Sequence, residues 1–149
     1  MSLENWLAER RLVRLESFRQ EITDLLAVVD RDLRDADIEQ LSADRRFMTA
    51  YNAVLQLATI VLRASGYRTR GVGHHWITFQ SLPLLIGANE NDRTDYFDAC
   101  RRKRNTADYD SSGEVSGAEV SELLDEASQF RHDVLAWLSE NHAELVPRL

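Results

Sequence analysis

The stretch from Ser42 to Gly66, SADRRFMTAYNAVLQLATIVLRASG, decides the fold. Its apolar residues recur at three- and four-residue spacing and form a wide face, as expected of a helix at the centre of a core. Ser42 is a suitable N-cap with Asp44 in the first turn, and Gly66 suits the C-terminal cap. The apolar face comprises Phe47, Tyr51, Val54, Leu55, Ala58, Ile60, Val61 and Leu62.

Amphipathic segments lie on both sides of this helix, joined by mostly short polar connections. No segment sustains the alternation of apolar and polar residues that is typical of a strand. Pro83 should kink or restart the shorter helix that follows Gly73, and Gly87 should end it. Ser116 and Glu119 have capping-box spacing at the start of the last helix. The further helices are expected at residues of about 3–34, 74–85, 92–108 and 116–140.

The first of these segments carries an apolar stripe through one helical region from about Leu3 to about Arg34. The stripe begins at Trp6 and Leu7, either in this helix or in a separate short one. Its later members follow at three- and four-residue spacing. They are Leu12, Leu15, Phe18, Ile22, Leu25, Leu26 and Val29.

The chain has 149 residues, of which 44% are hydrophobic and 29% charged. This composition is typical of a folded globular protein, and the length corresponds to about one domain. Such a chain can bury a core without disulfides or metals. We therefore expect residues 1–149 to form a single all-α domain, an antiparallel bundle of four to five helices.

Cys100 is the only cysteine, so an internal disulfide is impossible and a reducing compartment is indicated. The N-terminus lacks the basic and apolar regions of a signal peptide, and no apolar run approaches the ~20 residues of a membrane span. These features predict a cytoplasmic protein with no membrane contact. Cys100 itself falls on an apolar helix face, where a thiol is normally inert packing.

The formal net charge of −7 argues against nucleic-acid binding by overall electrostatics, so any such binding must come from a local basic patch. Lys103 is the only lysine, and arginine suits bidentate pairing with carboxylate or phosphate. A genome rich in G and C, which favours arginine codons, would explain the same bias without any function.

The run RRKRNTADYD, from Arg101 to Asp110, is the most informative segment for function. At 100° per residue, Arg104 falls on the same helix side as Phe97 and Cys100, so it projects along the core-facing edge. A charge in that position is costly unless it is paired or lines a cleft. Asp108, at i+4, is a possible partner. The pattern indicates either a functional site or an ion pair that clamps the helix end.

At these residues the chain resembles the HEPN superfamily. The resemblance covers about residues 47 to 130 and rests on Arg104-Asn105 followed closely by Tyr109, late in a small helical bundle. The preceding layout is similar too. It comprises Gly73-His74-His75, Leu82-Pro83-Leu84, Gly87 and Tyr96-Phe97-Asp98.

HEPN domains are small helical bundles, often dimeric, and many are metal-independent ribonucleases of toxin–antitoxin and defence systems. Others are inactive partners, frequently of nucleotidyltransferases. Active members carry an arginine, a polar residue and then a histidine four to six residues after the arginine. Arg104 and Asn105 match the first two, but Tyr109 stands in place of the histidine. Tyrosine, with a pKa of ~10, is a poor general base, so the family's cleavage mechanism is not expected here.

The resemblance therefore predicts a HEPN-like binding or interaction module without catalysis, working as a homodimer. It implies RNA, a nucleotide or a nucleotidyltransferase-type protein as partner, with no cofactor. The expected binding residues are Arg101, Arg104, Asn105, Asp108 and Tyr109, with Arg68 and Arg70 adding positive charge.

Two alternatives remain open from the sequence. One is an active ribonuclease toxin in which Arg104 works with Tyr109, or with His74 as a base supplied from another helix. The other is a helical module whose arginines form only an ion-pair network. A metal site is not expected, because the adjacent His74 and His75 would point about 100° apart on a helix.

Overall fold

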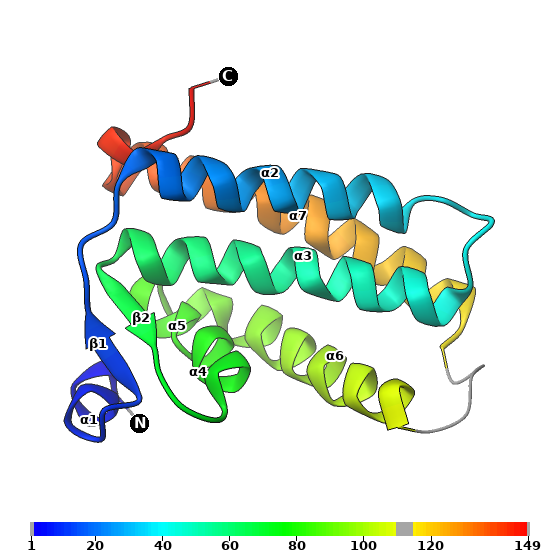
Figure 1. Cartoon of the computed structure of the whole chain (residues 1–149), viewed down its shortest axis with the longest axis horizontal. Coiled ribbons are helices and arrows are strands. Elements are labelled where there is room, and N and C mark those ends of the chain that lie inside the picture. Colours follow the sequence, from blue (N-terminus) through cyan, green and yellow to red (C-terminus); the bar gives the residue numbers. More distant parts are fainter. Residues whose placement is uncertain (1, 110–114, 149) are drawn as a thin grey trace.

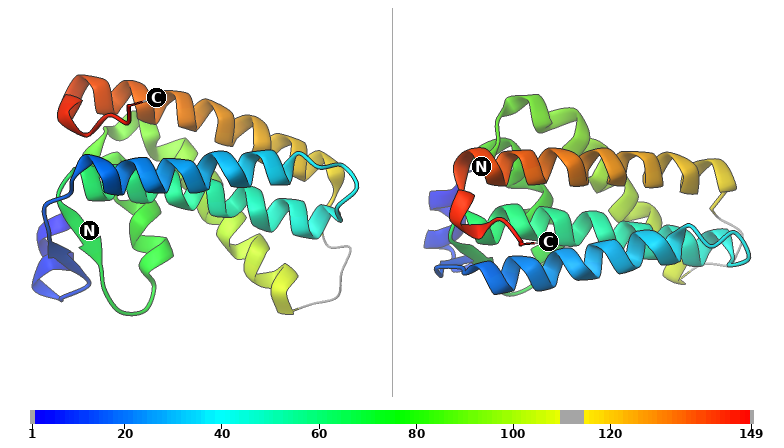
Figure 2. Two further views of the ribbon diagram at one scale, coloured as in Figure 1. Left: turned by 45° about the horizontal axis from the view of Figure 1, so that its top comes forward. Right: turned by 90° about the horizontal axis from the view of Figure 1, so that it is seen from above.

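The structure is a computed structural model that describes residues 2–109 and 115–148, with the side chains of 106–109 also left undescribed. Helix α3 (Ala43–Ala64) runs through the centre of the bundle, and the other long helices pack around it (Figure 1). Helices α2 (Arg19–Ala36) and α7 (Gly117–Asn141) lie on one side of it, and α4 (His74–Gln80) and α6 (Asn91–Tyr109) on another (Figures 1 and 2). The predicted all-α helical bundle is confirmed.

The central helix has the boundaries that its sequence predicts. The Ser42 hydroxyl accepts a hydrogen bond from the backbone N–H of Arg45, at 3.2 Å, and satisfies one of the free donors of the first turn. The helix ends at Ala64 with Ser65 as its C-cap, and Gly66 follows with a φ of +92°, a left-handed conformation that costs glycine little. Every residue of the predicted apolar face is buried.

The last helix and the broken middle helix also follow their sequence signals. Ser116 and Glu119 form a complete capping box at the start of α7. Pro83 lies in the first turn of a separate short helix, α5 (Leu82–Leu85), because proline cannot continue α4 but fits a helix start. A 3-10 turn, η1 (Ala88–Glu90), then leads into α6, and another, η2 (Ala143–Leu145), follows α7.

The expectation of one helical region from Leu3 to Arg34 is wrong, whereas the alternative of a separate short helix at Trp6 and Leu7 is confirmed. Helix α1 (Leu3–Ala8) stops early, and Arg10 reverses the chain with a φ of +59°. Strand β1 (Leu12–Arg14) comes next, before α2 begins. The helical spacing of the apolar residues was coincidental here, because Leu15 and Phe18 are 50% and 59% exposed rather than packed in the core.

Strand β1 pairs antiparallel with β2 (Tyr67–Thr69), so the described part of the chain contains a small two-stranded sheet that the sequence pattern did not predict. These strands are too short to show alternation. The pairing encloses a second, smaller apolar cluster beside the main core. Its buried members are Trp6, Leu12, Leu62 and Ile77.

By length and composition, helix α3 could also cross a membrane, although its sequence was not expected to contain such a stretch. In this fold 67% of its apolar window is buried inside the bundle. The central helix of a water-soluble core passes the same test, so its length does not distinguish the two settings.

Candidate functional site

Arg104 lies on the side of α6 that the sequence phase predicts. Phe97 and Cys100, on the same side, are 0% and 4% exposed. Arg104 is half-buried, and its guanidinium carbon lies 5.7 Å from the ring centroid of Tyr51 on α3. This is the geometry of a cation–π contact, which allows a charged group to sit at the edge of a core.

Tyr51 connects Arg104 to a histidine on a third helix. The Tyr51 side chain is 1% exposed, and its hydroxyl oxygen lies 3.1 Å from Nδ1 of His75. His75 is half-buried in the first turn of α4, which begins after Gly73 at a φ of +75°. Three helices, α3, α4 and α6, thus supply what we call the Tyr51 cluster, comprising Tyr51, His75, Arg101 and Arg104.

His74, the base considered for the ribonuclease alternative, contacts His75 and Gly71. The ring of His74 lies 4.7 Å from that of His75, and its Nδ1 is 3.3 Å from the carbonyl oxygen of Gly71. His74 is exposed at the end of the connection, whereas its neighbour contacts Tyr51. The histidine that approaches the arginines is therefore His75.

The Tyr51 cluster keeps both of its titratable groups uncharged at neutral pH. Burial, and to a smaller extent the positive charges of His74, Arg104 and Arg101, lower the pKa of His75 to about 4. Burial raises the pKa of Tyr51 well above its ordinary value, although Arg104 and Arg101 oppose the rise. The positive charge of the cluster therefore comes from the arginines alone.

Asp98, one turn before the arginine run, is 8% exposed and holds two of these side chains. It accepts hydrogen bonds from Nε of Arg101 at 2.8 Å and from a terminal nitrogen of Arg102 at 2.7 Å. These short, charge-assisted bonds fix the start of the basic run against α6. Arg101 is thereby positioned but partly neutralised, and Arg104 lies one turn further along.

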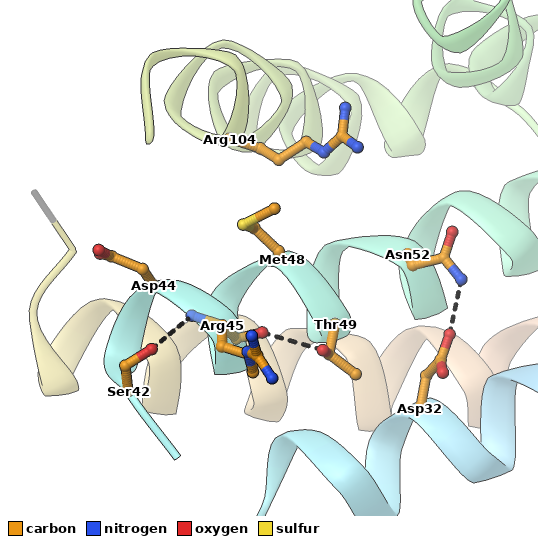
Figure 3. Close-up of a pocket in the computed structure, with 8 residues that line it drawn as sticks. All are labelled: Asp32, Ser42, Asp44, Arg45, Met48, Thr49, Asn52 and Arg104. Carbon is orange, nitrogen blue, oxygen red and sulfur yellow. Dashed lines mark hydrogen bonds between the residues drawn. The ribbon is translucent and has the colours of Figure 1, made fainter. Parts of the chain in front are cut away.

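A cleft of about 540 Å³ opens beside Arg104, between α6 and the first half of α3 (Figure 3). Arg104 reaches over it from α6, with Met48 of α3 facing it. On the far side Asp32 of α2 is 4% exposed and accepts a 2.6 Å hydrogen bond from Nδ2 of Asn52. The remaining lining residues are Ser42, Asp44, Arg45 and Thr49.

The other residues expected at the site are only partly brought together. Arg68 lies on β2, where it pairs with Glu21 of α2, and so its charge is already engaged away from Arg104. Arg70 is exposed beside Arg11, whose carbonyl accepts its backbone N–H at 2.9 Å. Asn105 is half-buried on α6. The side chains of Asp108 and Tyr109 lie outside the described residues.

Tyr51 and His75 are the members of the cluster that the sequence did not single out for function. Tyr51 belongs to the apolar stripe of α3 and was assigned to the core, which is correct for its ring. The site becomes visible only because the hydroxyl of Tyr51 contacts His75 of α4. The spacing of residues within one helix cannot predict a contact between two helices. Within the described ranges, no group of three or more His, Cys, Asp or Glu side chains is arranged to hold a metal ion.

Comparison with protein-family models, with curated proteins and with solved structures finds no match for this chain.

Proposed function

We propose that this protein is a HEPN-like binding module that holds the phosphate groups of RNA or of a nucleotide and does not cleave them. The observation that carries the proposal is the placement of Arg104. Its guanidinium rests on the buried ring of Tyr51, beside an open cleft, in a chain whose net charge is −7. Arginine at a partly desolvated edge is well suited to a phosphate oxyanion.

The surroundings of Arg104 support binding of a phosphate-bearing molecule. Arg101 also acts on both Tyr51 and His75, so the charges of two arginines reach the same small region, opposed at Tyr51 by the carboxylate of Asp98. The cleft has apolar, hydroxyl and amide groups from α3 in Met48, Thr49 and Asn52. Such mixed linings suit a ligand that joins a charged group to a flat or sugar-like part.

The same cluster argues against ribonuclease activity. Cleavage by attack of a 2′-hydroxyl needs a general base whose pKa lies near the working pH. His75 is the histidine closest to the arginines by its contacts, and its pKa is lowered to about 4. Its Nδ1 is also occupied by the Tyr51 hydroxyl. A base of this kind is too weak to activate a hydroxyl efficiently at neutral pH.

The biological setting that we propose rests on the resemblance alone. The module would act as a homodimer or with a nucleotidyltransferase-type partner, in a toxin–antitoxin or defence context in the cytoplasm. Sedimentation of the purified protein tests the homodimer directly, because a monomer at micromolar concentration would contradict it.

The test of function compares binding and cleavage of a labelled single-stranded RNA by the wild type and by Arg104→Ala. We expect binding without cleavage, and at least about tenfold weaker binding by the variant, because a charge-assisted contact contributes about 1.5–3 kcal/mol. Arg148→Ala, which removes an exposed arginine near the C-terminus, is the matched control and should bind normally.

Two outcomes would replace this proposal. Metal-independent RNA cleavage that Arg104→Ala abolishes would establish the ribonuclease alternative. Absence of RNA and nucleotide binding, with unfolding of Arg104→Ala, would leave only a structural ion-pair role for the arginine run. Thermal unfolding of each variant, followed by circular dichroism, separates loss of binding from loss of fold.

A further inference from the structure

The hydrogen bond between Tyr51 and His75 has a direction that the structure determines. A tyrosine hydroxyl has a single hydrogen to donate, and leaving it unpaired in a buried position costs free energy. Tyr51 is 1% exposed, and Nδ1 of His75 is the hydrogen-bond partner of its hydroxyl among the described residues. Tyr51 therefore donates, and Nδ1 of His75 accepts.

This direction fixes the tautomer of His75. A neutral imidazole carries its proton on one ring nitrogen only, so an accepting Nδ1 places the proton on Nε2. His75 is only half-buried, and among the described residues its Nε2 makes no hydrogen bond. The N–H of Nε2 is therefore available to an incoming ligand.

The groups around His75 suit an anion at that position. Tyr51 approaches from α3, the exposed His74 from α4, and Arg101 and Arg104 act on the ring from α6. The two arginines disfavour a charged imidazolium and attract an oxyanion, although Asp98 neutralises part of the charge of Arg101. A neutral N–H donor beside two cations can bind an oxyanion without adding to their mutual repulsion.

We propose that Tyr51 is a positioning residue that holds His75 as the Nε2–H tautomer, so that His75 donates a hydrogen bond to an oxyanion bound by Arg101 and Arg104. The identity of the ligand rests on the proposed function, whereas the tautomer of His75 is a property of the free protein. This tautomer assigns His75 the role of a donor and excludes it as a general base, because Nε2 already carries its proton.

The free protein is tested first, by nitrogen NMR of histidine-labelled protein at pH 7. His75→Gln assigns the resonances among the four histidines of the chain. In the wild type, Nδ1 of His75 should show the shift of an unprotonated, hydrogen-bonded nitrogen and Nε2 that of a protonated one. Tyr51→Phe should move the Nδ1 resonance toward that of an unbonded nitrogen while retaining the ring beneath Arg104. Tyr96→Phe, a change in a tyrosine of α6 that interacts with Cys100, should leave both unchanged.

The ligand is tested next, with inorganic phosphate and then with a short single-stranded RNA as probes. Phosphate should shift the Nε2 resonance of His75 in the wild type, and Tyr51→Phe should bind phosphate and RNA about threefold to tenfold more weakly, the loss expected for one hydrogen bond. A proton on Nδ1 of His75 in the wild type, or an Nδ1 resonance unaltered by Tyr51→Phe, would overturn the inference.

The two proposals fail in different ways. If RNA binds through Arg104 but neither nitrogen of His75 responds to RNA or phosphate, the role of His75 is wrong and the proposed function stands. If phosphate shifts Nε2 of His75 but neither RNA nor a nucleotide binds, the donor role stands and the proposed function is wrong.

Discussion

Tyr51 is a core residue whose hydroxyl takes part in the candidate site. Its ring packs edge-on against Phe79 at 5.9 Å between centroids, and Phe79, Phe97 and Phe130 continue the series at 5.6 and 5.1 Å. Aromatic rings packed in this way stabilise one another and define their positions closely. The hydroxyl end of Tyr51 is therefore held by the whole core, which makes it a rigid support for His75 and Arg104.

The lowered pKa of His75 predicts a pH effect on stability. With a pKa of about 4 in the folded state and an ordinary pKa near 6.5 when unfolded, the unfolded chain binds more protons between these values. The free energy of unfolding should therefore fall as the pH is lowered from about 6.5 to 4. Urea unfolding at several pH values measures this fall.

His75→Gln should make that pH dependence shallower, because it removes the titrating group. Ser121→Ala, which removes no titratable group at an exposed position of α7, is the control and should leave the slope as in the wild type. Equal slopes in the wild type and His75→Gln would show that His75 does not titrate differently in the two states.

Cys100 should be chemically inert in the folded protein. It is 4% exposed, and burial raises the pKa of its thiol to about 12, so almost none of the reactive thiolate is present at neutral pH. A thiol reagent should react with the native protein much more slowly than with the protein in urea. Equally fast reaction in both would contradict the burial of this side chain.

The boundaries of a helix could be predicted from the sequence where a capping residue marks the end of that helix. Helices α3 and α7 were predicted closely because Ser42 and Ser116 are caps that act within one turn. The end of α1 had no such signal, since Arg10 rather than a glycine takes the left-handed conformation there. Strand β1 depends on a partner far along the chain, which no local pattern in its three residues reveals.

In the candidate site, too, the features that depend on one helix could be predicted, and those that depend on packing between helices could not. The inward position of Arg104 followed from helical phase, which is a property of α6 alone. The contacts of Tyr51 with His75 and Arg104 depend on how α3, α4 and α6 pack, and the sequence does not specify these distances. Arg68 was expected to add positive charge to the site, but in the fold it is paired with Glu21.

The capping box of α7 gives a prediction at the helix scale. Ser116→Ala should lower the free energy of unfolding by about 1 kcal/mol, because the backbone N–H of Glu119 loses its acceptor. Ser121→Ala, at an exposed position inside the same helix, is the matched control and should be neutral or slightly stabilising. Urea titration measures both, and a Ser116→Ala variant as stable as the wild type would contradict the role of the cap.

The whole molecule combines a net charge of −7 with a local group of arginines, so binding should depend strongly on ionic strength. For RNA, the logarithm of the affinity should fall linearly with the logarithm of the salt concentration, with a slope of about −0.7 for each phosphate contacted. Arg104→Ala should make this slope shallower by about that amount. Fluorescence anisotropy at several salt concentrations measures it, and an unchanged slope would mean that Arg104 does not contact phosphate.

The pairing of Leu12 with Thr69 also joins the first residues of the chain to the candidate site. Leu12 of β1 packs in the apolar cluster that contains Ile77, and Ile77 belongs to α4, the helix that carries His75. The N-terminal segment therefore braces the helix that presents His75 to Tyr51. The geometry of the site is thus set in part by residues that contribute no group to it.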